Sequence, residues 1–264
     1  MTTQPANKER LRLDELLVRR GLFPTRSRAR DAIARGAVTL DGRKTTKPGQ
    51  PVRDDAVIEI DDPAQSYVSR AALKLAAGLD AFEFDPQGAF ALDVGASTGG
   101  FTQILLERGA AHVVAIDVGH GQLDAALAAD SRVTMLEKLN ARDLSAEHLE
   151  GKQPDFVVCD VSFISLKLAM PPALDLAAPG AHCLLLVKPQ FEAGREAVGK
   201  GGLLRDPANG ERIAADLAAW LDGRPGWRAL GAIASPIEGG DGNREFLLAG
   251  VKDRTGNYRN DWDE

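Results

Sequence analysis

The chain of 264 residues lacks long hydrophobic runs and contains few cysteines and few aromatic residues. No apolar stretch approaches the roughly 20 residues that a membrane-spanning helix requires. The opening residues, MTTQPANKER, contain no hydrophobic segment, so we expect no secretory signal there. No basic segment combines bulky aromatics with a strongly amphipathic helical pattern, which argues against a protein that attacks membranes. These absences favour a globular protein of the cytoplasm.

The two cysteines, Cys159 and Cys183, both lie inside apolar runs. They show no metal-ligand spacing, and neither do the four histidines, so we expect no metal site. Two buried free thiols in a reducing cytoplasm are the favoured interpretation, with a disulfide as the alternative.

The charge is unevenly distributed along the chain. The formal net charge is −6, yet residues 8–53 contain 13 Lys and Arg against 5 Asp and Glu. A basic module joined to an acidic body suggests that the module meets a polyanion. An ordinary solvated helix face is the alternative, but six arginines against one aspartate between Arg19 and Gly36 favour the polyanion.

The basic module reads as two short helices followed by strands. The segment LRLDELLVRRG places Leu13, Leu16 and Leu17 on one helical face, and Thr25 is an N-cap candidate for the second helix. Asp41-Gly42 predicts a tight turn between extended segments. Residues 11–60 therefore resemble the alpha-L RNA-binding motif. That resemblance implies contacts from basic side chains to RNA phosphates, and the candidates are Arg19, Arg20, Arg26, Arg28, Arg30, Arg35, Arg43 and Lys44.

The larger part of the chain alternates short apolar runs with helical patterns, which predicts a doubly wound, mostly parallel α/β sheet of Rossmann-like type. We expect three segments: an α+β RNA-binding domain over 8–62, the sheet domain over 63–251, and a polar tail over 252–264. The expected strands are Phe90–Val94, Val113–Asp117, Val133–Leu136, Phe156–Asp160 and Cys183–Val187.

A glycine-rich turn, GASTGGF, follows the first of these strands. A dinucleotide fingerprint would need a glycine where Ser97 stands, and a P-loop would need a lysine where Phe101 stands. A nucleoside without phosphates, S-adenosylmethionine (SAM), fits better. The candidate cofactor contacts are Asp93, Gly95, Ala96, Ser97, Thr98, Gly99, Gly100, Phe101 and Asp117, the last placed where a ribose-binding carboxylate belongs.

Charged residues end several of the expected strands. Asp93, Asp117, Asp160 and Lys188 each occupy such a position, where the carboxyl ends of parallel strands form a ligand crevice. Taken singly, each has a simpler explanation. Asp160 could cap a helix, Lys188 could be a solvated strand end, and Glu245 could form a surface pair with Arg244.

Five segments in order, SRAALKL, DVGASTGGFTQ, CDVSF, VKPQFE and NREFLL, resemble the FtsJ-type RNA ribose 2′-O-methyltransferases. With the alpha-L motif in front, residues 8–251 are similar to the TlyA (haemolysin A) family of rRNA cytidine 2′-O-methyltransferases. The resemblance implies a catalytic tetrad of Lys74, Asp160, Lys188 and Glu245, and Asp143 facing the adenine of SAM. It also implies small- or large-subunit rRNA, or both, as substrate.

These residues suit a ribose hydroxyl that attacks a sulfonium methyl group. Desolvation and Lys74 would lower the pKa of Lys188, whereas Asp160 opposes that shift, so Lys188 is either the base or a cation that stabilises the alkoxide. Cys159 as a cytosine-C5 nucleophile is disfavoured, because it sits inside an apolar run. A non-catalytic RNA-binding protein, a small-molecule methyltransferase and a haemolysin are the alternative functions.

Overall fold

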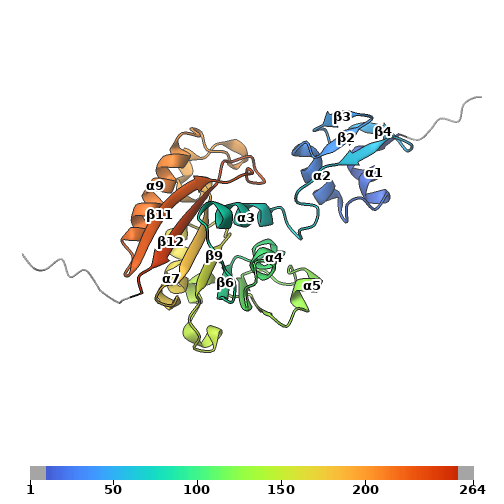
Figure 1. Ribbon diagram of the computed structural model, residues 1–264. Helices are drawn as coiled ribbons and strands as arrows, with labels where there is room; N and C mark the ends of the chain where they lie inside the picture. The colour runs from blue at the N-terminus through green and yellow to red at the C-terminus, as the bar shows by residue number, and fades with distance from the viewer. Residues whose placement is uncertain (1–9, 255–264) are drawn as a thin grey trace, which may run out of the picture. The chain divides into compact units, whose positions relative to one another are not determined.

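The structure is a computed structural model that describes residues 10–254, and it divides into two compact units at Ser66/Tyr67 (Figure 1). The division lies slightly beyond the boundary expected from the sequence. A contact within the first unit accounts for the difference, because Arg28 donates to the carbonyl of Ala64, beyond the expected boundary, at 3.1 Å. The segment 255–264 of the expected tail lies outside the described residues.

The first unit consists of two helices and short antiparallel strands. Strand β2 pairs with β3 on one side and β5 on the other, and β1 pairs with β4. The elements are β1 (Arg10–Arg12), α1 (Leu13–Arg19), α2 (Arg26–Ala34), β2 (Val38–Leu40), β3 (Arg43–Thr45), β4 (Pro51–Arg53) and β5 (Ile58–Ile60).

Local sequence signals account for this unit. The leucines of α1 are fully buried, and the Thr25 side chain accepts a hydrogen bond from the backbone of Arg28 at the start of α2. Asp41 and Gly42 both have positive φ, 48° and 76°, which is the conformation of a two-residue hairpin turn that twists with its strands. The predicted helices and hairpin are therefore confirmed.

The second unit contains a seven-stranded sheet of order β11-β12-β10-β9-β6-β7-β8. Neighbouring strands from β10 to β8 pair in parallel, whereas β12 pairs antiparallel with both β10 and β11. The strands are β6 (Phe90–Val94), β7 (His112–Asp117), β8 (Val133–Glu137), β9 (Phe156–Cys159), β10 (His182–Val187), β11 (Trp227–Ala234) and β12 (Phe246–Lys252). The mostly parallel sheet is confirmed, and the sequence did not predict the antiparallel pair.

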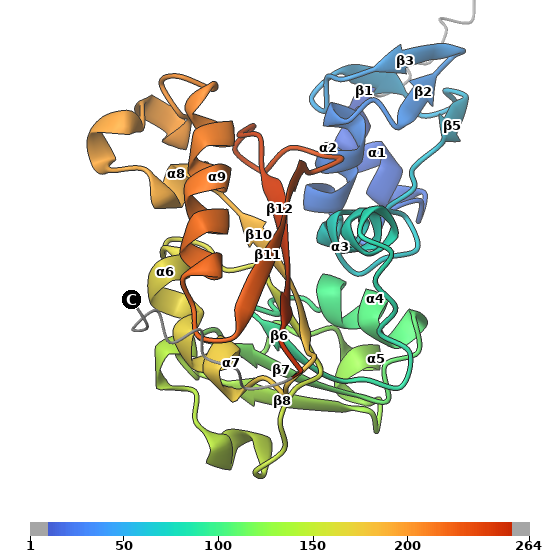
Figure 2. The same ribbon diagram turned by 60° about the vertical axis from the view of Figure 1, so that its left-hand side comes forward.

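Helices cover both faces of this sheet (Figures 1 and 2). One face packs against α3, α4 and α5, and the other against α6, α7 and α9. The helices are α3 (Ala71–Ala81), α4 (Gly100–Glu107), α5 (Ala125–Ala128), α6 (Leu166–Ala169), α7 (Pro171–Leu176), α8 (Pro189–Glu192) and α9 (Asn209–Asp222). No helix among the described residues is long and apolar enough to cross a membrane.

The sheet topology brings distant parts of the chain to one edge. The carboxyl ends of β6, β7, β9 and β10 share that edge because these strands are parallel. Strand β12 runs the opposite way and pairs its first residue, Phe246, with Val187 at the end of β10. Glu245, which precedes β12, therefore reaches the same edge as Lys188.

Candidate functional site

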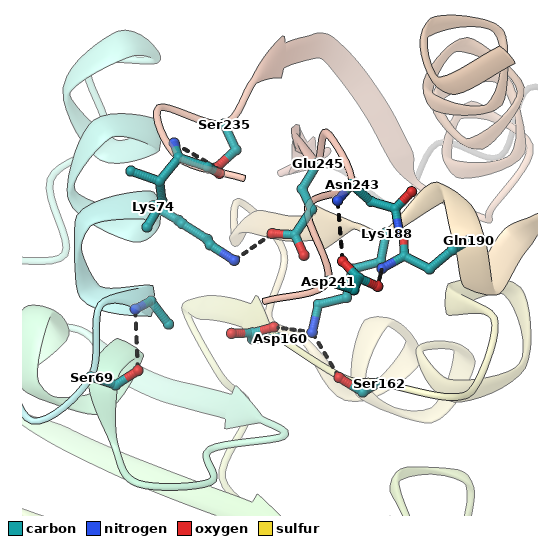
Figure 3. A network of polar contacts seen from close by, with 12 residues as sticks. Ser69, Lys74, Asp160, Ser162, Lys188, Gln190, Ser235, Asp241, Asn243 and Glu245 are labelled. Carbon is teal, nitrogen blue, oxygen red and sulfur yellow. Dashed lines mark hydrogen bonds and ion pairs between the residues drawn. The ribbon is translucent and has the colours of Figure 1, made fainter. Parts of the chain in front are cut away.

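Lys188 and Asp160 form an ion pair at the carboxyl edge of the sheet. The Nζ of Lys188 lies 2.6 Å from Oδ1 of Asp160 and donates to Oγ of Ser162 at 2.8 Å. Their side chains are only 12% and 18% exposed. The pair joins two neighbouring strands, because Asp160 follows β9 and Lys188 follows β10 (Figure 3).

A second ion pair joins Lys74 of α3 to Glu245 ahead of β12. Both side chains are almost completely buried, at 6% and 3% exposed. Burial raises the pKa of Glu245, although the nearby Lys74 opposes this shift. In Figure 3 both pairs lie close together, so the structure brings all four residues of the expected tetrad to one site.

The simpler explanations for single residues fail. Ser165, and not Asp160, caps the helix that follows β9. Lys188 is largely buried and paired instead of solvated. Glu245 turns inward to Lys74, while Arg244 approaches Glu211 at 3.7 Å.

A cavity of about 530 Å³ opens beside the Lys188–Asp160 pair. This volume is in the range of small-molecule sites. The cavity is lined by Val94, Gly95, Ser97, Ile116, Asp117, Val118, Gln122, Leu139, Asn140, Ala141, Asp160, Val161, Ser162, Phe163, Ile164 and Ala169. A smaller cavity of about 80 Å³ shares Gly95, Ser97 and Asp160 with the first, and Ala96, Thr98, Gly100 and Phe101 also line it.

The glycine loop is shaped by backbone conformations that favour glycine. Gly95 and Gly99 have φ of 84° and 97°, and Ser97 adopts φ of 48° despite its side chain. The Asp117 carboxylate holds this loop, since Oδ2 accepts from the amide of Ser97 at 2.8 Å and Oδ1 from the amide of Gly119 at 2.7 Å. Asp117 thus forms part of the wall of the larger cavity and orients the glycine loop through the amide of Ser97.

Asp93 lies fully buried in β6 beneath the loop. Its Oδ2 accepts a hydrogen bond from the Thr102 hydroxyl at 2.6 Å, and its Oδ1 has no protein partner among the described residues. Burial raises the pKa of Asp93 to about 7, with smaller contributions from the carboxylates of Asp160 and Asp117.

Three expected cofactor contacts lie outside the cavity linings, and one of them is Asp93, buried beneath the loop. Asp143 is exposed in a short 3₁₀ helix, Ala141–Asp143, although its neighbours Asn140 and Ala141 do line the larger cavity. Gly99 contributes to neither lining and is the N-cap residue that precedes α4. Their contact with the cofactor stays a prediction.

Cys159 and Cys183 are both free and fully buried. Burial raises the pKa of each thiol strongly, so neither is present as a nucleophilic thiolate at neutral pH. Within residues 10–254, no cluster of His, Cys, Asp and Glu could hold a metal ion.

The arginines of the first unit differ in their surroundings. Arg35 is 18% exposed and binds Asp62 through two nitrogens, so its guanidinium is engaged within the unit. Arg19, Arg20, Arg26 and Arg28 also have intramolecular partners but keep exposed or half-exposed surface. The exposed candidates that bind no other side chain within the described part of the chain are Arg30, Arg43 and Lys44.

Sequence reasoning missed Ser162 and Glu192. Ser162 belongs to the segment CDVSF and Glu192 to VKPQFE, two of the five segments that resemble the FtsJ-type enzymes. Their roles depend on loop conformation: Lys188 meets Ser162, and Glu192 accepts from Ser165 at 2.6 Å and from the amide of Leu166 at 2.7 Å. Only the sequence motif itself could have singled them out.

Comparisons with known proteins identify the family of the chain. A model described as FtsJ-like methyltransferase matches residues 67–252, and one described as S4 domain matches residues 11–58. The 16S/23S rRNA (cytidine-2′-O)-methyltransferase TlyA of Mycobacterium tuberculosis is 45% identical over 240 residues, which make up 90% of this chain and 89% of that protein. Hemolysin A of Brachyspira hyodysenteriae is 39% identical over 90% of this chain and 98% of its own length.

Among solved structures, a candidate hemolysin from Streptococcus thermophilus superposes with a TM-score of 0.72 at 37% identity, covering 94% of this chain and 90% of that one. The matched ranges coincide with the two units of the structure, and the resemblance deduced from the sequence motifs is confirmed. The chain therefore belongs to the TlyA family, with an S4 domain ahead of an FtsJ-like methyltransferase domain.

Proposed function

We propose that this protein transfers a methyl group from SAM to the ribose 2′-hydroxyl of cytidine in rRNA of the small subunit, the large subunit or both. The proposal rests on the position of Asp160, which lines the cavity and forms an ion pair with Lys188. The buried Lys74–Glu245 pair lies beside them (Figure 3). A ligand in this cavity would meet Asp160 directly, and Lys188 is paired with that carboxylate. The cytoplasm, where ribosomes are assembled, is the expected compartment.

The residues around the cavity fit SAM. The unpartnered Oδ1 of buried Asp93 offers an acceptor for an ammonium group, reached directly or through the loop above it. Gly95 keeps the loop close to the neighbouring strand, since a Cβ there would lie 3.0 Å from the carbonyl oxygen of Asp160. Asp117, in the wall of the cavity, has lone pairs left for ribose hydroxyls beyond its two backbone hydrogen bonds.

Bound SAM supplies an electrophilic methyl group on a sulfonium. The protein must align a weak nucleophile with that methyl and stabilise the oxyanion that develops. Lys188 suits the second task as a cation, because the carboxylate of Asp160 lies 2.6 Å from its Nζ. Glu245 holds the ammonium of Lys74 inside the site in the same way.

The first unit is proposed to supply affinity for rRNA. Its exposed basic side chains, including Arg30, Arg43 and Lys44, would contact phosphates and position the substrate without reading its sequence. The name printed for the Mycobacterium tuberculosis relative, an rRNA cytidine-2′-O-methyltransferase, supports the choice of rRNA and of cytidine.

The test is a pair of substitutions with opposite effects. Lys188→Ala is expected to lower methyl transfer to ribosomal subunits by about 10²-fold or more while the Kd for SAM stays within about twofold, because Lys188 acts on the developing charge. Asp117→Ala is expected to weaken SAM binding by about 10-fold to 100-fold, because it removes the acceptor for two loop amides. Methyl transfer is followed with radiolabelled SAM, and binding by calorimetry.

Retained turnover in Lys188→Ala would remove that residue from the proposed chemistry. Binding of SAM and rRNA without any methyl transfer by the wild type would favour a non-catalytic RNA-binding protein. Leakage of liposomes at low protein concentration would favour the haemolysin alternative, and we expect none.

A further inference from the structure

We propose that Ser162 is a positioning residue for Lys188, and that Glu192 holds the loop that presents Ser162. This inference rests on the proposed function for its kinetic consequences. Its structural part concerns the ammonium of Lys188 alone.

The ammonium of Lys188 has three N–H donors. One is donated to the hydroxyl of Ser162 at 2.8 Å, whereas Oδ1 of Asp160 lies 2.6 Å from Nζ as an ion-pair partner without hydrogen-bond geometry. Ser162 therefore fixes the direction of one N–H, while Asp160 holds the ammonium in place by its charge. Both partners also line the larger cavity, so Lys188 is held by two residues of the cavity wall.

The loop that carries Ser162 is fixed at both ends. At its start, the amide of Asp160 donates to the carbonyl of Val94 at 3.0 Å. At its end, the two carboxylate oxygens of Glu192 accept from the Ser165 hydroxyl at 2.6 Å and from the Leu166 amide at 2.7 Å.

Glu192 belongs to α8, the helix that directly follows Lys188. The same short helix therefore fixes the lysine and the loop that supplies its partner. Between the fixed ends, Phe163 adopts φ of 66°, a conformation that a bulky residue holds only when its surroundings impose it. The loop is thus constrained to bring the Ser162 hydroxyl to Nζ.

The kinetic test compares Ser162→Ala with Ser162→Thr and with Ser145→Ala. Ser145 also carries a hydrogen-bonded hydroxyl, but it lies at the start of the 3₁₀ helix Ala146–Leu149 and belongs to neither cavity lining. We expect Ser162→Ala to lower kcat by about tenfold, the usual effect of losing a hydrogen bond to a charged group. KM for ribosomal subunits and Kd for SAM should stay within about twofold, and Ser162→Thr should restore most of kcat, because its hydroxyl preserves the acceptor.

Glu192→Gln tests the supporting contact. The amide oxygen can still accept from Leu166, so this variant should fold, as checked by its melting temperature, while it loses the charged acceptor for Ser165. We expect a loss of kcat in the same direction as in Ser162→Ala and smaller.

A measurement that needs no catalysis tests the geometry itself. Purified full-length protein is labelled with an amine-reactive reagent, and the rate of labelling at each lysine is read by mass spectrometry. Lys188 should react severalfold faster in Ser162→Ala than in wild type or Ser145→Ala, because one of its two partners is gone. Lys152, whose side chain is 59% exposed, serves as the internal reference and should react at the same rate in all variants.

Unchanged labelling of Lys188 in Ser162→Ala would overturn the inference, whatever the activity of the wild type. A kcat equal to that of wild type would overturn it as well. Faster labelling in a protein that transfers no methyl group would support the positioning of Lys188 by Ser162 and contradict the proposed function, so the two failures are distinguishable.

Discussion

Asp93 combines complete burial with one oxygen that no described protein group satisfies. A carboxyl group in such a place is stabilised in its neutral form, and its ionisation opposes folding. The position follows from the sequence, since Asp93 lies in an apolar strand that is covered on both faces. A cationic ligand above the loop would compensate for this charge.

The stability of the ligand-free protein should therefore depend on Asp93 and on pH. Burial raises the pKa of Asp93 from 3.8 to about 7, so between these values the folded state binds more protons than the unfolded state. The free energy of unfolding contributed by this group then falls as pH rises through the window, by at most about 1.4 kcal/mol per pH unit. Below pH 3.8 and above about 7 the contribution is constant.

Urea denaturation of wild type and Asp93→Asn at a series of pH values checks this. Other carboxylates contribute equally to both proteins, so the difference between their free energies of unfolding isolates Asp93. As pH rises from 3.8 to about 7, we expect the wild type to lose stability relative to Asp93→Asn. A difference that is the same at pH 4 and pH 7 would show that Asp93 does not titrate as stated.

The residues of the tetrad could be predicted because each lies in a motif that resembles a known family. What sequence could not supply is how they pair. Lys74 and Glu245 stand 171 positions apart, and their pairing depends on β12 lying beside β10. Ser162 was not predicted for a similar reason, because its hydrogen bond with Lys188 exists only in the folded loop.

The glycine loop between β6 and α4 lines both cavities and is the element that we propose to bind SAM. Gly95 has a positive φ of 84° and leaves no room for a side chain, whereas Gly88 has a φ of 74° and open space around its Cβ position. A substitution at Gly88 therefore tests backbone strain alone. A substitution at Gly95 tests backbone strain together with the close approach of a neighbouring carbonyl.

Gly88→Ala should lower the free energy of unfolding by about 1 kcal/mol, the cost of a left-handed conformation for a residue with Cβ. Gly95→Ala should cost at least about 1 kcal/mol more, because the new Cβ meets a backbone carbonyl that cannot move aside freely. We also expect only Gly95→Ala to weaken SAM binding, as measured by calorimetry. Equal effects of both substitutions on stability and binding would contradict the close approach inferred at Gly95.

Helix α2 and the β2–β3 hairpin carry three exposed cations of the first unit, Arg30, Arg43 and Lys44. Replacing Arg30, Arg43 and Lys44 together by alanine should flatten the slope of log affinity for rRNA against log salt by about 2 to 3 units. The melting temperature should stay near that of wild type, since these side chains are exposed.

Arg35→Ala is the matched comparison for the triple variant. It leaves the Asp62 carboxylate, 2% exposed, without its bidentate partner and should cost about 2 kcal/mol or more in stability. A triple variant with an unchanged salt dependence would exclude these three residues from the RNA-binding surface.

At this scale the sequence predicted the central parallel strands to within one residue at each end, because short, continuous apolar runs are typical of strands covered on both faces. It did not predict β11, whose residues alternate between more and less exposed positions along the edge of the sheet. Strands β1 and β4 were also missed: each is three residues long, and they pair between Arg10–Arg12 and Pro51–Arg53. Nothing local in either segment marks that pairing.

The whole molecule divides its tasks between two compact units. The acidic methyltransferase domain contains the cavity and the four charged residues, and the S4 domain contains the exposed basic side chains. This division matches the uneven charge of the sequence, in which residues 8–53 are basic and the remainder is acidic.

Removal of residues 1–66 should therefore separate the two activities. We expect SAM affinity within about twofold of the full chain, because every residue that lines the cavities lies beyond Ser66. The affinity for rRNA should fall, and its salt dependence should flatten by about one unit for each phosphate that the shortened protein no longer neutralises. If the shortened protein keeps both the affinity and the slope, the methyltransferase domain itself binds the RNA.

The position of β12 in the sheet also determines when the site can be completed during synthesis of the chain. Domains tend to fold while the chain is still being synthesised, starting from the N-terminal side. Here the strand between β10 and β11 comes from residues 246–252, and it brings Glu245 to the buried ammonium of Lys74. A nascent chain that has not yet exposed this segment has an open gap in its sheet and a lysine without a counterion. The Lys74–Glu245 pair thus forms only when β12 is added, and a chain terminated before β12 is left with an incomplete site and an open sheet.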